Sequence, residues 1–263
     1  MKNPLPAKLF FILSIFLGFF FISVPLGYAA IYLDTVSSKD SGTGGASQLT
    51  WNHTVTIGAS HRLIIVGVSI DDNTDTTVTS VTYGGQSLSQ VPGATATYNA
   101  ARVDMWYRKD PLTGINSVQV NLSRSTQAVG GATSYTGVDQ TTPFGTACAA
   151  ANRSGTASCS VSSAADELVV DVVCAESTSA TLTVGANQTQ RYKNEVTNAR
   201  AGGSTEPGAA SVTMSWTISA TKDWAIAAVP IKPVSGGTTL AALSSFEASA
   251  YDEGVMLQWR TGY

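Results

Sequence analysis

The stretch that decides the fold is Ser211-Val212-Thr213-Met214-Ser215-Trp216-Thr217-Ile218. An apolar side chain occupies every second position, and serine or threonine occupies the positions between. Side chains of a β-strand point alternately to opposite faces, so this pattern predicts a strand with one buried and one solvated face. The same alternation occurs in residues 102–108 and 118–123, whereas a helical period is nearly absent. The chain is therefore predicted to be all-β.

Two segments are apolar on both faces, Leu63–Val68 and Leu168–Cys174. Such runs are typical of the central strands of a packed sandwich. Gly84-Gly85, between two alternating segments, is a strong signal for a two-residue hairpin. About a dozen strands are expected between Ile31 and Lys232, too many for one open sheet of this size. We expect a two-sheet antiparallel β-sandwich, jelly-roll-like, and no internal repeat is evident in the sequence.

The N-terminus is predicted to be an export signal. Lys2 and Lys8 supply a positive segment, an apolar run over Leu9–Val24 follows, and Gly27-Tyr28-Ala29 supplies small residues for signal peptidase. Residues 1–29 therefore read as a signal peptide cleaved before Ala30. The alternative is an uncleaved membrane anchor, because the apolar run nearly reaches spanning length. The polar chain that follows favours cleavage, so we expect a secreted or cell-surface protein that meets the membrane only through its signal peptide.

The rest of the chain divides into three parts. Residues 30–232 are predicted to form the sandwich, and residues 233–240 a flexible linker rich in Gly, Ser and Thr. Residues 241–263 contain two further strand patterns, Leu243–Ala248 and Val255–Arg260. Two strands cannot bury a core, so this tail is expected to be the start of an incomplete second β domain.

The charge balance argues against some partners. The chain has 15 basic and 18 acidic residues, and removing Lys2 and Lys8 with the signal peptide leaves 13 against 18, a net charge of −5. That balance gives no electrostatic footprint for nucleic acid or anionic lipid. A hydrophobic content of 43% argues against disorder, and the low charged fraction of 13% suits an extracellular β protein.

Three cysteines in an exported chain raise the question of pairing. Cys148 and Cys159 lie symmetrically about Asn152-Arg153-Ser154-Gly155, a plausible turn, and a hairpin centred there would bring them within disulfide reach. Cys174 is left over. It shares a strand face with Val170 and Val172, so we expect a small buried hydrophobic residue.

Several motifs between residues 45 and 232 resemble those of exported sandwich modules in large, modular bacterial surface proteins. They are Leu49–Val55, Arg62–Ser69, Val78–Gln86, Gly137–Pro143 and Trp224–Val229. The resemblance implies the fold and the location outside the cell, and it carries no catalytic residues. The tail Leu243–Tyr263 is similar to the opening strands of a fibronectin-type-III-like domain.

An acidic turn offers a candidate calcium site. Asp71, Asp72, Asn73 and Asp75 place four oxygen-bearing side chains within five residues. Calcium takes six to eight oxygen ligands, but this spacing lacks the glycine and distal glutamate of an EF-hand loop. The alternative is a solvated turn rich in residues that tolerate a left-handed backbone.

A second candidate is a glycan platform around Trp106. The alternation places Trp106 on the polar face of its strand, together with Arg102, Asp104 and Arg108. An aromatic ring can stack on the apolar face of a sugar while charged groups bind its hydroxyls. The alternative is a Trp packed beneath a neighbouring loop beside ordinary surface ion pairs. Trp224 is also out of phase, but core packing is expected there.

Features of an enzyme are sparse. The histidines, His53 and His61, are expected at the surface, and no Gly-x-Ser-x-Gly elbow accompanies them. A pair of carboxylates for glycoside cleavage, such as Asp104 and Glu195, would be distant in sequence and is not selected by any pattern.

The leading prediction is a non-catalytic extracellular or cell-surface module for adhesion, glycan contact or spacing within a larger protein. Its expected partners are glycans or other surface proteins, with calcium as the one candidate cofactor. The alternative is a secreted carbohydrate-active enzyme or its accessory domain.

Overall fold

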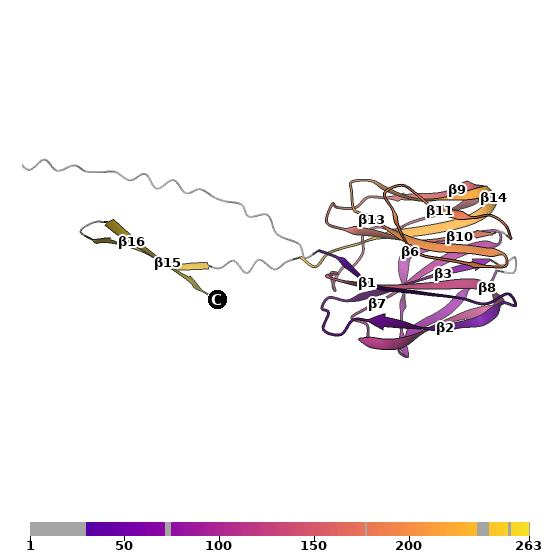
Figure 1. Cartoon of the computed structure of the whole chain (residues 1–263), viewed down its shortest axis with the longest axis horizontal. Helices are drawn as coiled ribbons and strands as arrows, with labels where there is room; N and C mark the ends of the chain where they lie inside the picture. The colour runs from indigo at the N-terminus through magenta and orange to yellow at the C-terminus, as the bar shows by residue number, and fades with distance from the viewer. Residues whose placement is uncertain (1–29, 72–74, 177, 236–241, 252–253, 263) are drawn as a thin grey trace, which may run out of the picture.

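The computed structural model describes residues 30–71, 75–176, 178–235, 242–251 and 254–262, with side chains described up to residue 235 (Figure 1). Every regular element in these ranges is a strand. The first eight are β1 (Tyr32–Asp40), β2 (Ala46–Val55), β3 (Leu63–Asp71), β4 (Val78–Tyr83), β5 (Gln86–Ser87), β6 (Ser89–Tyr98), β7 (Ala101–Lys109) and β8 (Gly114–Thr136). The others are β9 (Cys148–Val161), β10 (Leu168–Glu176), β11 (Leu182–Val184), β12 (Thr189–Val196), β13 (Ala199–Pro207), β14 (Val212–Ile231), β15 (Ala242–Tyr251) and β16 (Gly254–Gly262).

The predicted all-β, two-sheet antiparallel sandwich is confirmed. One sheet follows the order β5-β4-β8-β3-β7-β6, with β1 and β2 also paired to β8. The other follows β11-β14-β10-β13-β12, with β9 also paired to β14. The predicted hairpin at Gly84-Gly85 is present, with positive φ at both glycines (55° and 77°), as a two-residue turn of this hand requires.

Each sheet folds over on itself because its longest strand bends. The first part of β8 pairs with β2 and β4, and the second part pairs with β1 and β3. In the same way, the first part of β14 pairs with β11 and the end of β9, and the second part pairs with β10 and the start of β9. The sandwich therefore has four layers, with the bend of β9 and β14 near the top of Figure 1 and β2 near the bottom.

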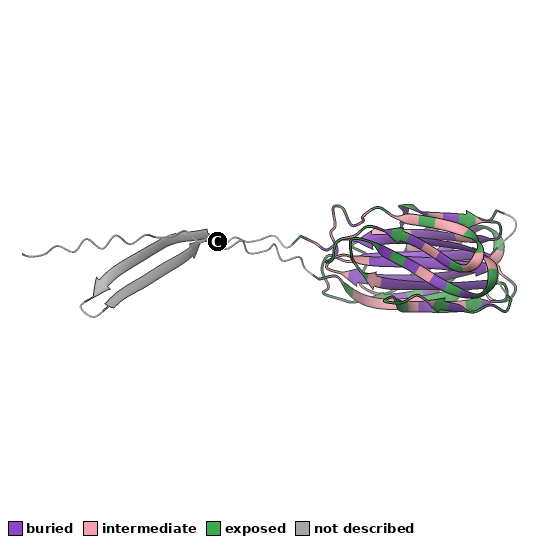
Figure 2. Cartoon of the chain, turned by 90° about the horizontal axis from the view of Figure 1, so that it is seen from above, coloured by how far each residue is buried: buried purple, intermediate pink, exposed green. Residues whose placement is uncertain are grey.

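The described residues form three large apolar cores between these layers and a small fourth cluster of Val129, Val196, Ala199 and Ala201. One fills the bend of the first sheet around Trp51 and Val118, one fills the bend of the second around Trp216 and Val173, and the third joins the two sheets. Every residue of β3 is buried, and so is nearly all of β10, which confirms that both are central strands. Figure 2 shows this burial concentrated in the inner strands.

The two sheets repeat one topology, which the sequence did not reveal. In the first, a central strand (β3) lies between a long bent strand (β8) and a hairpin (β6–β7); in the second, β10 lies between β14 and the hairpin β12–β13. We call residues 30–136 the first repeat and residues 148–231 the second.

The two repeats also agree in their strand irregularities and in single backbone hydrogen bonds. The β6–β7 hairpin has a register shift just after the pair Gln90↔Trp106, and the β12–β13 hairpin has one just after the equivalent pair Gln190↔Ser204. Two backbone hydrogen bonds also correspond, Gly84 N to Ser117 O and Gly185 N to Ser215 O, both 2.9 Å. The two sheets therefore form a structural repeat that was not evident in the sequence.

The ends of the chain bear on the predicted boundaries. The predicted signal peptide, residues 1–29, lies outside the described residues. Pro233, expected to begin the linker, still forms a β-bridge with Val138, and Val234 N donates to Gly137 O over 2.8 Å. In the tail, β15 and β16 pair as an antiparallel hairpin, as the two strand patterns predict.

Candidate functional site

The predicted glycan platform lies on β7, and its carboxylate, Asp104, already accepts hydrogen bonds from neighbouring side chains. Asp104 is 1% exposed and accepts hydrogen bonds from Arg102 Nε (2.6 Å) and Arg102 Nη2 (3.0 Å). Gln90 Nε2 and Thr95 Oγ1 also donate to it, each over 3.0 Å. These donors satisfy the buried charge within the protein. Asp104 is therefore a structural anchor between β6 and β7 in this geometry.

The other platform residues are partly engaged. Arg108 donates to Gln86 Oε1 (3.0 Å) and to Ser87 O (3.1 Å), which ties β7 to β5. Trp106 is half-buried against the core of the first sheet, and its indole Nε1 is buried without a hydrogen-bond partner. The structure therefore keeps the four residues on one strand face and leaves Trp106 partly exposed.

The acidic turn is described only at its ends. Asp72 and Asn73 of the predicted calcium site lie outside the described residues. Asp71 ends β3 and is buried, and Asp75 is exposed with a φ of 57°. Within residues 30–71, 75–176 and 178–235, no three His, Cys, Asp or Glu side chains form a group that could hold a metal ion.

The predicted disulfide is present, in a different setting. Cys148 and Cys159 are bonded with their Cα atoms 5.9 Å apart. They do not face each other across a hairpin, because both arms of β9 pair with β14. Instead, the bridge joins two layers across the bend of β9. Cys174 is buried in the central core, as expected, and its Sγ lies 3.2 Å from Ile70 O.

The prediction that His53 lies at the surface is wrong. His53 is 2% exposed, because β1 covers the end of β2 that carries it. Ser37 Oγ lies 2.8 Å from its Nδ1, and Thr35 Oγ1 lies 3.1 Å from its Nε2. Burial lowers the pKa of His53 to about 4, against a smaller opposing effect of Asp34, so the ring is neutral at pH 7. His61 is exposed, as expected.

The hydrogen bonds of His53 do not form a catalytic triad. Asp34 does not contact the ring; Ser134 Oγ donates to Asp34 over 2.9 Å, and Thr56 N donates over 3.0 Å. A triad needs the histidine between nucleophile and carboxylate, whereas here both ring nitrogens face hydroxyls. The network joins β1, β2 and β8.

A second buried polar group was missed because it lies in a central strand. Asp171, in β10, is 2% exposed and accepts hydrogen bonds from Ser204 N (2.6 Å), Ser204 Oγ (2.8 Å) and Trp216 Nε1 (2.8 Å). Burial raises its pKa to about 7, although these donors oppose the shift. The sequence shows one acidic residue interrupting Leu168–Cys174, which was the available signal.

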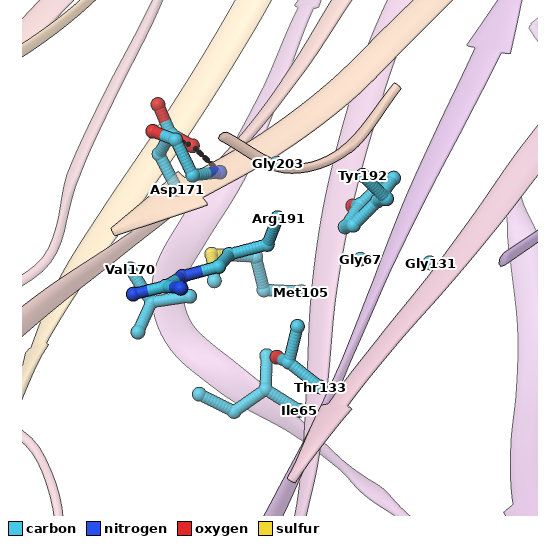
Figure 3. Close-up of a pocket in the computed structure, with 11 residues that line it drawn as sticks. Ile65, Gly67, Met105, Gly131, Thr133, Val170, Asp171, Arg191, Tyr192 and Gly203 are labelled. Carbon is cyan, nitrogen blue, oxygen red and sulfur yellow. Dashed lines mark hydrogen bonds between the residues drawn. The ribbon is translucent and has the colours of Figure 1, made fainter. Parts of the chain in front are cut away.

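A small cavity lies beside Asp171, between the two repeats (Figure 3). Its volume is about 10 Å³, which is room for roughly one water molecule. Tyr192 reaches across it from β12 and lies over Gly67, Gly131 and Gly203, whose missing side chains make room for the ring. This cavity is a packing feature of the central core, too small for an organic ligand.

The remaining candidates are separated. Asp104 belongs to the first sheet and Glu195 to the second, where it lies 3.6 Å from Arg200 Nε. Trp224 is 6% exposed in the core of the second sheet, as expected, and its Nε1 donates to Ser154 Oγ over 2.8 Å.

Comparisons with known proteins place no other protein beside this chain. No family model, no curated protein and no solved structure matches it. Among the described residues, no helix is long and apolar enough to cross a membrane.

Proposed function

We propose that the chain is an exported, non-catalytic module of a cell-surface or secreted protein, and that it acts as a rigid spacer or attachment unit. The observation that carries the proposal is the disulfide between Cys148 and Cys159, which joins two layers of the fold. Disulfides persist in oxidising compartments and are rare in the cytosol. The export pattern of residues 1–29 supports the same location.

The mode of packing supports rigidity. The two repeats share the central core and each closes a second core of its own, so neither has an apolar sheet face left open to water. The charged clusters around Asp104 and Asp171 are satisfied by the protein's own donors. A module built in this way keeps its shape under load, which suits spacing and adhesion.

Export is tested by expressing the full chain in a bacterium with a secretory pathway. The expected product outside the cytosol begins at Ala30, shown by N-terminal sequencing, and contains one disulfide and one free thiol, shown by mass spectrometry. Retention in the cytosol with three free thiols would refute the proposal.

Glycan contact through Trp106 is the second candidate, favoured by the partial exposure of Trp106 on the strand face that it shares with Arg102 and Arg108. A glycan array should be probed with the wild type, with Trp106→Ala, and with Tyr32→Ala as the control, because Tyr32 is a 66% exposed aromatic residue on a different strand. Binding that is lost in Trp106→Ala and kept in Tyr32→Ala supports a glycan-binding module. Turnover of a polysaccharide by the purified protein would instead favour a carbohydrate-active enzyme.

A further inference from the structure

The two repeats place two different linkages at one equivalent position. Register fixes the correspondence on the bent strands. Ala132 of β8 and Ala228 of β14 lie opposite equivalent central-strand residues, Val66 and Asp171. On their other side these alanines pair with Ser37 and Cys148, respectively. Ser37 in the first repeat therefore corresponds to Cys148 in the second.

The other half of each linkage corresponds in the same way. The matching hydrogen bonds of Gly84 with Ser117 and of Gly185 with Ser215 align the first parts of β8 and β14. The neighbours of these serines, Asn116 and Met214, pair with His53 and Cys159. His53 therefore corresponds to Cys159, and the Ser37–His53 hydrogen bond of 2.8 Å stands where the second repeat has its disulfide.

Both linkages hold the same parts together. The disulfide joins the two arms of β9, one in the inner layer and one in the outer layer. The Ser37–His53 contact joins β1 of the inner layer to β2 of the outer layer. Trp51, which fills the space between them over Gly130, donates from Nε1 to Ser37 Oγ over 2.9 Å and adds to the same junction.

The hydrogen bonds around His53 use the neutral ring as both an acceptor and a donor. Ser37 Oγ accepts from Trp51, so its own proton is free to go to Nδ1, and the Nε2 proton is then donated to Thr35 Oγ1. A protonated ring cannot accept from Ser37, so the Ser37 hydroxyl would have to turn and accept from Nδ1 as well as from Trp51 Nε1. Of the described residues, the titratable groups beside the ring are Asp34 of β1 and Tyr83 of β4, whose ring lies edge-on at 6.1 Å. Neither forms an ion pair with the ring, so an imidazolium here would be a buried charge without a direct partner.

We propose that the Ser37–His53 contact is an acid-sensitive clasp for the first repeat, equivalent in position to the redox-sensitive disulfide clasp of the second repeat. Protonation of the His53 ring reverses the Ser37 hydrogen bond and places a positive charge at a 2% exposed site without an ion-pair partner. This cost favours an opened first repeat, in which β1 is free from β2. Reduction of the disulfide by a dithiol, which becomes a cyclic disulfide as the cystine becomes two thiols, frees the arms of β9. Each repeat thus opens in response to its own chemical signal.

Hydrogen–deuterium exchange of the mature chain, read segment by segment and corrected for the intrinsic effect of pH, tests the proposal. At pH 3.5 without reductant, exchange is expected to rise about ten- to a hundredfold in β1 and β2 relative to pH 7, and to stay unchanged in β9. At pH 7 with a dithiol, the rise is expected in β9 alone. A rise of β9 in acid equal to that of β1 and β2 contradicts the proposal.

Two variants isolate the ring. His53→Gln keeps hydrogen-bonding capacity without a titrating group, so its exchange in β1 and β2 should be the same at both pH values. Ser37→Cys combined with His53→Cys should form a second disulfide, detected by mass spectrometry, and lose the acid response. If the double variant does not fold, the test depends on His53→Gln alone. A rise of exchange in β1 and β2 of His53→Gln in acid, equal to that of the wild type, would contradict the proposal.

Discussion

At the scale of single residues, burial decides the role of several polar groups. Asp104 was a candidate for glycan contact and His53 was expected at the surface, and both are almost fully enclosed. Asp171 belongs to the same class, because four hydrogen-bond donors surround its carboxylate in the core of the second sheet. Each of these side chains joins strands that are distant in sequence.

The raised pKa of Asp171 predicts how stability depends on pH. The folded-state pKa of about 7 lies above the ordinary value of 3.8, so the native state binds the extra proton between these values. The contribution of protonated Asp171 to the free energy of unfolding is complete below about pH 4 and is lost as the pH rises through 7. The total loss is on the order of 4 kcal/mol. Urea midpoints from pH 4 to pH 8 should show this fall in the wild type and a flatter curve in Asp171→Asn. If the urea midpoint fell equally with pH in the wild type and in Asp171→Asn, the pH dependence would not come from Asp171.

The calcium prediction at the turn after β3 remains open to a direct measurement. A bound ion stabilises the native state, so a chelator is expected to lower the melting temperature if Asp71 and Asp75 contribute ligands. The matched control is Asp71→Asn with Asp75→Asn, whose melt should not respond to chelator. An unchanged wild-type melt excludes the site.

At the scale of elements, close approach between strands sets the demand for glycine. Gly131 of β8 lies under the Tyr192 ring, so a methyl group there would overlap the ring. Gly131→Ala is expected to destabilise the protein by about 3 kcal/mol, the upper part of the range for overpacking. Urea unfolding measures the loss. Gly44→Ala is the control, because a methyl group there meets no atom within 4 Å.

The disulfide acts on one element, the bent strand β9. Its two cysteines are 11 residues apart, and the chain-entropy model gives a stabilisation of about 3 kcal/mol for a loop of this size. Replacing Cys148 and Cys159 with alanine should lower the free energy of unfolding by that amount. Adding reductant to the wild type should give a similar loss and should leave the double variant unchanged. If reductant also lowered the free energy of unfolding of the double variant, the reductant would be acting on a group other than this disulfide.

At the scale of the whole molecule, the shared core predicts cooperative unfolding. Leu63 and Met105 of the first repeat pack in one cluster with Val172 and Ala227 of the second. Because each repeat buries its inner sheet face against the other, neither is expected to unfold alone at neutral pH without reductant. Tryptophan fluorescence and near-ultraviolet circular dichroism should give coincident transitions. Two separated transitions would show that the repeats are independent.

The sequence determined the elements. Alternation in Val212–Ile218, the doubly apolar runs around Val66 and Val172, and the glycine pair at Gly84 depend on local geometry, so they could be interpreted without a partner strand. The pairing of Cys148 and Cys159 was predicted from a hairpin about residues 152–155, whereas the structure joins them across the bend of β9.

Only the tertiary structure decided which strands cover one another and which side chains are buried between them. The bends of β8 and β14 and the register of β1 on β8 bury His53 and align the two repeats. Some equivalent positions keep the same residue, as Ala132 and Ala228 do, but the linkage positions differ, with serine and histidine in one repeat and two cysteines in the other. Backbone pairing fixes a position in space without fixing the side chain that occupies it, so only the tertiary structure shows that the two linkages stand at corresponding positions.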